Sequence, residues 1–101
     1  MIIYNVTTKV DHTIAEEWLA WMQQVHVPEV MATSCFTQTQ MLRLLETDDS
    51  DGPTYAVQYF AESKASYNSY VTLHGDALRK KTLDCWGNKI IAFRSLMQVV
   101  H

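Results

Sequence analysis

The sequence predicts an α+β fold in which two amphipathic helices alternate with four strands. Three observations lead to this prediction. Residues 14–26 repeat apolar side chains at helical spacing, with two tryptophans among them. Residues 2–10 and residues 89–100 alternate along the chain in the way that is typical of strands. A turn-rich segment at residues 47–53 separates two further apolar runs, which favours a hairpin.

The first strand and the first helix follow from these two periodicities. In the strand, one face carries Ile2, Tyr4, Val6 and Val10, and the other carries Ile3, Asn5, Thr7 and Lys9. In the helix, the apolar stripe consists of Ile14, Trp18, Trp21, Met22 and Val25. We expect the helix to bury this stripe against the sheet.

Both ends of this helix carry recognisable signals. Asp11 can cap its start, and Thr13 with Glu16 forms the pattern of a capping box. Pro28 disfavours helical geometry at the preceding residue, so we expect the helix to end or kink near His26. Pro28 can then open a short extra turn through Met31.

The rest of the chain predicts a hairpin, a second helix and a last strand. Cys35–Glu46 and Thr54–Ala61 are expected to pair antiparallel across the turn. Ser63 is placed to cap the second helix, Gly75 weakens its middle, and Gly87 suits a left-handed terminating position. In the strand Lys89–Val100 we assign the more apolar face to the helices: Ile91, Phe93, Met97 and Val99.

The resulting order is the ferredoxin-like βαββαβ arrangement, a four-stranded antiparallel sheet with two helices on one face. The other face then carries a mixed set: Ile3, Asn5, Thr7, Gln58, Phe60, Ile90, Ala92, Arg94, Leu96 and Gln98. This set is too apolar for a continuous wet surface and too polar for a dry core. We therefore predict a homodimer through the helix-free sheet face.

Composition limits the function classes. The 101 residues, 48% hydrophobic and 19% charged, predict one domain spanning residues 1–101 with a modest core. The net charge of −3 argues against nucleic-acid binding, and we expect the one basic run, Arg79-Lys80-Lys81, to lie on a solvated helix face.

The ends of the chain and its cysteines predict a cytoplasmic protein. The N-terminus lacks the pattern of a signal peptide, and no stretch approaches the ~20 apolar residues of a membrane span, so no membrane partner is expected. Cys35 and Cys85 have no paired spacing and should be reduced thiols. The four histidines are far apart in the sequence, so no metal site is expected.

The chain resembles the dimeric α+β barrel superfamily. The resemblance rests on the element order, the mixed second face and three segments, namely Trp18–Val30, Pro53–Phe60 and Ala92–Val99. Within that superfamily the chain is most similar to a small bacterial family of domains of unknown function. The resemblance covers essentially the whole chain and implies the fold and the dimer. It carries over no activity, because the superfamily includes monooxygenases, haem-degrading oxygenases, isomerases and stress-response proteins.

His26 is the first candidate catalytic residue. At the predicted helix end, the negative pole of the helix dipole favours the protonated imidazole, which would titrate near neutrality as an acid or base must. The alternative is a structural histidine that hydrogen-bonds the carbonyls freed by Pro28. Glu29 could orient the ring or simply be solvated.

Asn5 and Arg94 are the other two catalytic candidates, and both are assigned to the helix-free face. An arginine inside a barrel could hold a carboxylate or a planar oxygenated substrate. The alternative for Arg94 is a pairing with an acid such as Glu46 or Glu62, or with the dimer mate.

Four further residues are candidates for ligand binding: Trp18, Trp21, Met22 and Tyr59. Plain core packing is the alternative for each. The resemblance also bears on cofactors, because haem-degrading relatives use an asparagine, then a tryptophan, then a histidine. Here Asn5 matches, but His74 precedes Trp86, so we expect no haem and no other cofactor.

Two functional hypotheses remain open. In the first, a small cytosolic homodimer binds a small apolar or aromatic metabolite, or acts as an interaction module. In the second, the dimer is a cofactor-free monooxygenase or isomerase in which His26 is the acid or base and Asn5 or Arg94 orients the substrate.

Overall fold

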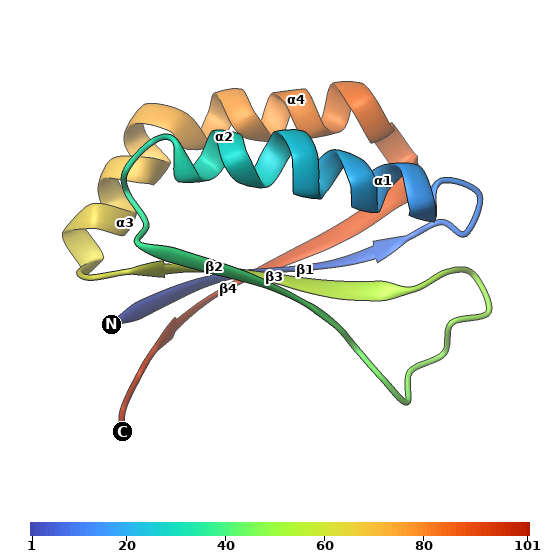
Figure 1. Ribbon diagram of the computed structural model, residues 1–101, viewed down its shortest axis with the longest axis horizontal. Helices are drawn as coiled ribbons and strands as arrows, with labels where there is room; N and C mark the ends of the chain where they lie inside the picture. The colour runs from blue at the N-terminus through green and yellow to red at the C-terminus, as the bar shows by residue number, and fades with distance from the viewer.

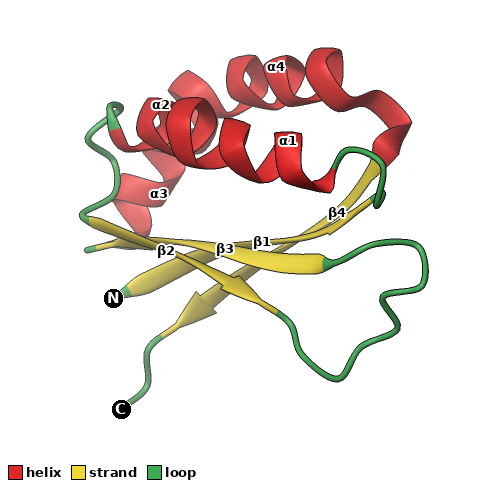
Figure 2. Ribbon diagram, turned by 45° about the vertical axis from the view of Figure 1, so that its right-hand side comes forward, coloured by secondary structure: helices red, strands yellow, loops and turns green.

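The computed structural model describes residues 1–101 and has the predicted order of elements. The strands are β1 (Ile2–Val10), β2 (Gln38–Arg43), β3 (Thr54–Ala61) and β4 (Ile90–Gln98). They form one sheet in the order β2-β3-β1-β4, with every neighbouring pair antiparallel. All helices lie on one side of this sheet (Figure 1), and the other side carries none (Figure 2). The ferredoxin-like βαββαβ fold is thereby confirmed.

Each helical stretch contains a π-helical turn. The first consists of α1 (Ala15–Trp21), the π-helix η1 (Met22–His26) and α2 (Val27–Met31). The second consists of α3 (Lys64–Tyr70), the π-helix η2 (Val71–Gly75) and α4 (Asp76–Trp86), with a 3₁₀ turn η3 (Gly87–Lys89) after it. None of these helices has the length and apolar content needed to cross a membrane.

Of the predicted signals of the second helix, the Ser63 cap is confirmed, whereas Gly87 has a positive φ with a ψ of −126° and so does not adopt the left-handed helical conformation. The Ser63 hydroxyl accepts the backbone N–H of Ser66 at 3.2 Å, which satisfies one free donor of the first turn. Gly87 has φ +54° and follows the last residue of α4. Gly75 keeps helical dihedral angles, so the second stretch continues through it.

The predictions for the first helix are confirmed in part. The extra turn with Pro28 that runs through Met31 is present as α2, and the helix is irregular near His26, where the π-helix η1 ends. The helix does not end there, because Val27 is helical and its N–H donates to the carbonyl of Met22, five residues back. The wider π-turn shifts the backbone by one residue and thus accommodates the ring of Pro28. The capping box does not form either, since Asp11 Oδ1 accepts both the N–H and the hydroxyl of Thr13, at 2.9 and 2.6 Å.

The core lies between the sheet and the helices. On the sheet side it consists of Tyr4, Thr8, Val10, Val57, Tyr59 and Ala61. On the helix side it consists of Trp18, Met22, Val30, Tyr70 and Leu78. The predicted inward face of the first strand is therefore confirmed.

The predicted orientation of the last strand is wrong. Arg94 is paired with Val6 and Leu96 with Tyr4, so Arg94 and Leu96 share the face that the helices cover. The prediction placed the more apolar side of β4 against the helices. The assumption that the more apolar side of a strand faces the helices fails for β4, because its more apolar side lies on the helix-free face.

That face, called the helix-free face from here on, is richer in apolar side chains than predicted. The register gives its members as Ile3, Asn5, Thr7, Lys9, Gln38, Gln40, Leu42, Thr54, Ala56, Gln58, Phe60, Ile91, Phe93, Ser95 and Met97. Phe93 is 65% exposed and Ile91 is 59% exposed. Contiguous exposed apolar patches are uncommon on the surface of monomeric proteins.

Candidate functional site

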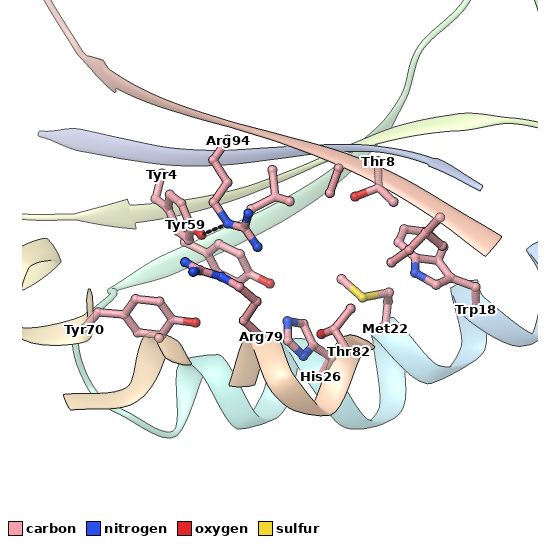
Figure 3. A pocket seen from close by; sticks show the side chains of 14 residues that line it. Tyr4, Thr8, Trp18, Met22, His26, Tyr59, Tyr70, Arg79, Thr82 and Arg94 are labelled. Atoms are coloured by element: carbon pink, nitrogen blue, oxygen red, sulfur yellow. Dashed lines mark hydrogen bonds between the residues drawn. The ribbon is translucent and has the colours of Figure 1, made fainter. Parts of the chain in front are cut away.

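A cavity of about 60 Å³ lies between the sheet and the two helical stretches (Figure 3). Its walls come from β1, β3 and β4 on one side and from both helical stretches, including α1 and η1, on the other. One water molecule needs about 10–15 Å³ of such space, so the enclosed part of the cavity has room for about four to six waters. The cavity opens beside β4, where Ala92 and Arg94 are exposed.

The helical wall is built at the two π-turns. Met22 and His26, the first and last residues of η1, both line the cavity. Gly75 ends η2, and Arg79 and Thr82 follow it at spacings of four and three, so the three form one stripe. π-Turns inside α-helices occur frequently at functional sites.

His26 faces this cavity from η1, and its ring stacks on Trp21 with centroids 5.0 Å apart. No hydrogen bond within the chain restrains the imidazole, so the expected bonds to carbonyls near Pro28 are not formed. Burial lowers the pKa of His26 below its ordinary value of 6.5, against an opposing effect of Glu29. Because the helix continues past His26, no helix end favours the protonated imidazole, which is therefore neutral at pH 7.

Arg94 reaches the same cavity from β4. Its Nε donates to the Tyr4 hydroxyl at 3.0 Å (Figure 3). Arg94 forms no ion pair with a carboxylate, so the expected pairing with Glu46 or Glu62 is absent. The other guanidinium nitrogens are free to bind a ligand.

Arg79 brings a second guanidinium group to the cavity from α4 (Figure 3). Its only acidic partner is Asp76, 3.9 Å away on the solvent side and fully exposed. The lining contains two arginines and no aspartate or glutamate. The cavity is therefore positively charged although the whole chain carries −3.

Two phenol groups add donors to the wall. Tyr59 and Tyr70 line the cavity, and neither hydroxyl is engaged in a hydrogen bond within the chain. Burial raises the pKa of both tyrosines well above the ordinary 10.0, so both keep their protons at neutral pH. Their hydroxyls are therefore hydrogen-bond donors.

The candidate ligand-binding residues fall into two groups. Trp18, Met22 and Tyr59 line the cavity, and Trp18 and Tyr59 are only 1% and 2% exposed. Trp21 does not line it, because it packs behind His26 and meets the edge of Trp86, with ring centroids 5.7 Å apart. Trp21 thus supports the imidazole from outside the cavity.

Asn5 lies on the opposite side of the sheet from His26 and Arg94. Its amide donates to the Thr7 hydroxyl at 2.9 Å on the helix-free face. The three catalytic candidates therefore do not form one site, since Arg94 joins His26 and Asn5 is separated from both. The misassigned orientation of β4 explains only why Arg94 was grouped with Asn5, because Asn5 itself was correctly assigned to the helix-free face.

Sequence reasoning missed Arg79 and Thr82 as lining residues. The basic run was expected to be solvated, and Lys80 and Lys81 do form surface ion pairs with Asp84 and Glu29. Of the three, only Arg79 lines the cavity, and its side chain is still 46% exposed. The available signal was its spacing of four residues from Gly75 and three from Thr82, which gives all three one helix face.

Other reactive side chains lie apart from the cavity. Cys35 and Cys85 are free thiols, and neither lines it. His74 lies in an outer groove between the helices. No group of three or more histidine, cysteine, aspartate or glutamate side chains is placed to hold a metal ion.

Comparison with known proteins places this geometry in context. A family model described as "Domain of unknown function (DUF4286)" matches residues 1–100. No curated protein matches the chain. Among solved structures, a dimeric ferredoxin-like protein from an uncultured marine organism has a TM-score of 0.71 and 17% identity, with 99% of this chain and 95% of that chain covered.

Two further solved structures have the same fold. SnoaB, a cofactor-independent oxygenase from Streptomyces nogalater, has a TM-score of 0.68 and 12% identity, with 99% and 94% of the two chains covered. An ethyl tert-butyl ether degradation family protein from Bacillus halodurans has a TM-score of 0.67 and 11% identity, with 98% and 100% covered. At these identities the likeness supports the fold and leaves the activity open.

Proposed function

The chain belongs to the DUF4286 family of domains of unknown function, and from that premise we propose that it binds a small planar aromatic molecule between its sheet and its helices. The observation that carries the proposal is the cavity itself. Trp18 and Met22 form its apolar end, while hydroxyl, imidazole and guanidinium groups line the rest (Figure 3). Apolar walls with a few convergent polar groups are typical of small-molecule sites, which favours ligand binding over an interaction module.

Calorimetric titration of the full chain with phenol and with benzamide tests this proposal. We expect saturable binding of both single-ring probes with a Kd of about 1 mM or tighter. Ala92→Leu places a larger side chain at the cavity opening and should weaken both by about tenfold. Ala77→Leu, in the outer groove, is the matched control and should bind both probes like wild type. Absence of binding, or binding that Ala92→Leu leaves unchanged, would refute the proposal.

A second candidate function is a cofactor-free oxygenase or isomerase reaction that begins with proton abstraction. The observation that favours it is a neutral His26 imidazole facing the same cavity as two guanidinium groups. A neutral imidazole can accept a proton from an acidic carbon, and an arginine can stabilise the resulting enolate. SnoaB, which shares the fold, is described as a cofactor-independent oxygenase.

Hydrogen exchange separates this candidate from simple binding. We expect wild type to accelerate deuterium incorporation from D₂O at the benzylic carbon of phenylacetone, as followed by NMR. His26→Gln should lose most of this acceleration, because an amide cannot act as the base. If both proteins exchange at the uncatalysed rate, the enzymatic candidate is rejected and ligand binding stands.

We also propose that the protein is a homodimer through the helix-free face. Exposed Phe93, Ile91 and Met97 support this proposal, as does the fold shared with a dimeric ferredoxin-like protein. Unpaired Cys35 and Cys85 support a reducing, cytoplasmic location.

A further inference from the structure

At the polar end of the cavity, several side chains can donate hydrogen bonds, but no carboxylate is present to accept them. Arg79 and Arg94 both lie close enough to Tyr70 to lower its pKa, in opposition to the larger effect of burial. The two guanidinium groups therefore share one region, which Figure 3 shows at the tyrosine end, away from Trp18. Like charges in one cavity repel unless an anion lies between them.

The unused hydrogen-bond donors of the cavity also favour a bound anion. Tyr59 and Tyr70 each offer an unengaged O–H, and Arg94 keeps the N–H groups of its terminal nitrogens after Nε is bound to Tyr4. No carboxylate lines the cavity to accept these donors. A ligand that supplies acceptor oxygens with negative charge would satisfy them together.

We propose that the cavity selects an aromatic carboxylate, whose carboxylate group binds Arg79 and Arg94 and whose ring extends toward Trp18 and Met22. This inference rests on the proposed function and names its ligand class. A carboxylate is planar and matches the planar guanidinium group in size and geometry. The enclosed volume of about 60 Å³ receives the part of the ring that faces Trp18, and the carboxylate lies nearer the opening beside β4, where Arg94 is exposed.

Benzoate and benzamide form a matched pair of probes, because they have the same shape and differ in charge. In titrations of the full chain near neutral pH, we expect benzoate to bind at least about tenfold more tightly than benzamide. The double variant Arg79→Gln/Arg94→Gln should lower this ratio to about one, by weakening benzoate and sparing benzamide. Arg43→Gln removes an arginine outside the cavity, whose ion pair is with Asp49, and should keep the wild-type ratio.

The outcomes separate this inference from the proposed function. If wild type binds benzamide as tightly as benzoate and Ala92→Leu weakens both, the cavity binds aromatic molecules without selecting anions, and the inference alone is overturned. If the double variant keeps the preference for benzoate, the two arginines do not provide it and the inference is again overturned. If neither probe binds wild type, the inference and the proposed function both fail. Comparison of the two probes on wild type needs no variant, so a folding defect in the double variant cannot hide the answer.

Discussion

The chemistry of the cavity depends on which of its side chains carry a proton at neutral pH. Burial disfavours a charged imidazole and a charged phenolate alike, so His26 is neutral and Tyr59 and Tyr70 keep their protons. Arg94 stays charged because a guanidinium group does not lose its proton in proteins. One neutral base therefore faces a set of donors and cations, which suits a ligand with an acidic proton or a negative charge.

Tyr4→Phe tests whether Arg94 is held in place for its ligand. Removing the hydroxyl deletes the bond from Arg94 Nε and frees the guanidinium to move, while the buried ring is retained. We expect benzoate binding to weaken by about threefold to tenfold, in proportion to one charge-assisted hydrogen bond, with benzamide binding unchanged. Calorimetric titration measures both, and equal loss for the two probes would instead indicate a change in cavity shape.

The lowered pKa of His26 predicts a pH dependence of stability. The unfolded chain takes up a proton near 6.5, whereas the folded chain does so only at a lower pH. The stability contribution is therefore complete above pH 6.5 and falls as pH decreases through that value. Urea unfolding between about pH 8 and pH 5 should show a loss that His26→Gln reduces. Asp11, Asp48 and Asp49 have pKa values below 3.8 and do not titrate in this window. A slope of equal size in the variant would contradict the prediction.

Residue patterns in the sequence predict part of this site. Trp18 and Met22 belong to the predicted apolar stripe and do line the cavity. Val25 was assigned to the same stripe but is 40% exposed, because the π-turn changes the phase of the helix and His26 faces the cavity instead. Arg79 was hidden within a basic run, because two of that run's three residues are indeed solvated. The phase of a helix thus identifies inward residues better than the charge of a segment does.

The two helical stretches share one irregularity, and it shapes the site. Each has a π-turn of five residues near its middle, at Met22–His26 and Val71–Gly75. Sequence periodicity assumes 3.6 residues per turn, so it cannot locate a turn that hydrogen-bonds five residues back. For this reason Pro28 predicts a helix end in the sequence, although the helix accommodates it.

Gly52 and Gly87 lie in segments that connect helices and strands, and we expect their substitution by alanine to lower the free energy of unfolding by different amounts. Gly52 has φ +144°, and a Cβ there would lie 1.8 Å from the carbonyl oxygen of Val10 on β1. Gly52→Ala should lower the free energy of unfolding by about 3 kcal/mol, because the backbone must shift. Gly87 has φ +54° with open space around it, so Gly87→Ala should cost only about 1 kcal/mol. Urea unfolding of both variants measures the difference, and equal costs would contradict the tight packing at Gly52.

The strands differ in how far the sequence determines their orientation. β1 and β3 are central strands, and their buried faces follow from simple alternation. β4 is an edge strand, with almost every residue exposed on both faces in a single chain. The more apolar side of β4 lies on the helix-free face and not in the core. Alternation therefore divided the residues of β4 correctly into two faces, but the more apolar face was assigned to the helices by mistake.

At the scale of the whole molecule, the cavity and the proposed dimer face lie on opposite sides of one sheet. The residues that line the cavity lie on the helix-covered side of the sheet. Phe93 and Ile91 belong to the other side. Association should therefore stabilise the sheet without completing the ligand site, and the two properties should separate on mutation.

Phe93→Glu tests this separation. A carboxylate in the centre of an apolar interface would be desolvated without a partner, so we expect dissociation of the dimer. Light scattering after size exclusion should give twice the chain mass of 11.6 kDa for wild type and 11.6 kDa for the variant. Leu73→Glu is the matched control, because Leu73 is 70% exposed on the helix side, and it should remain dimeric.

The monomeric variant should still bind benzoate if the cavity is complete within one chain. A monomeric wild type would refute the dimer, and a dimeric Phe93→Glu variant would show that the contact lies elsewhere than on the helix-free face.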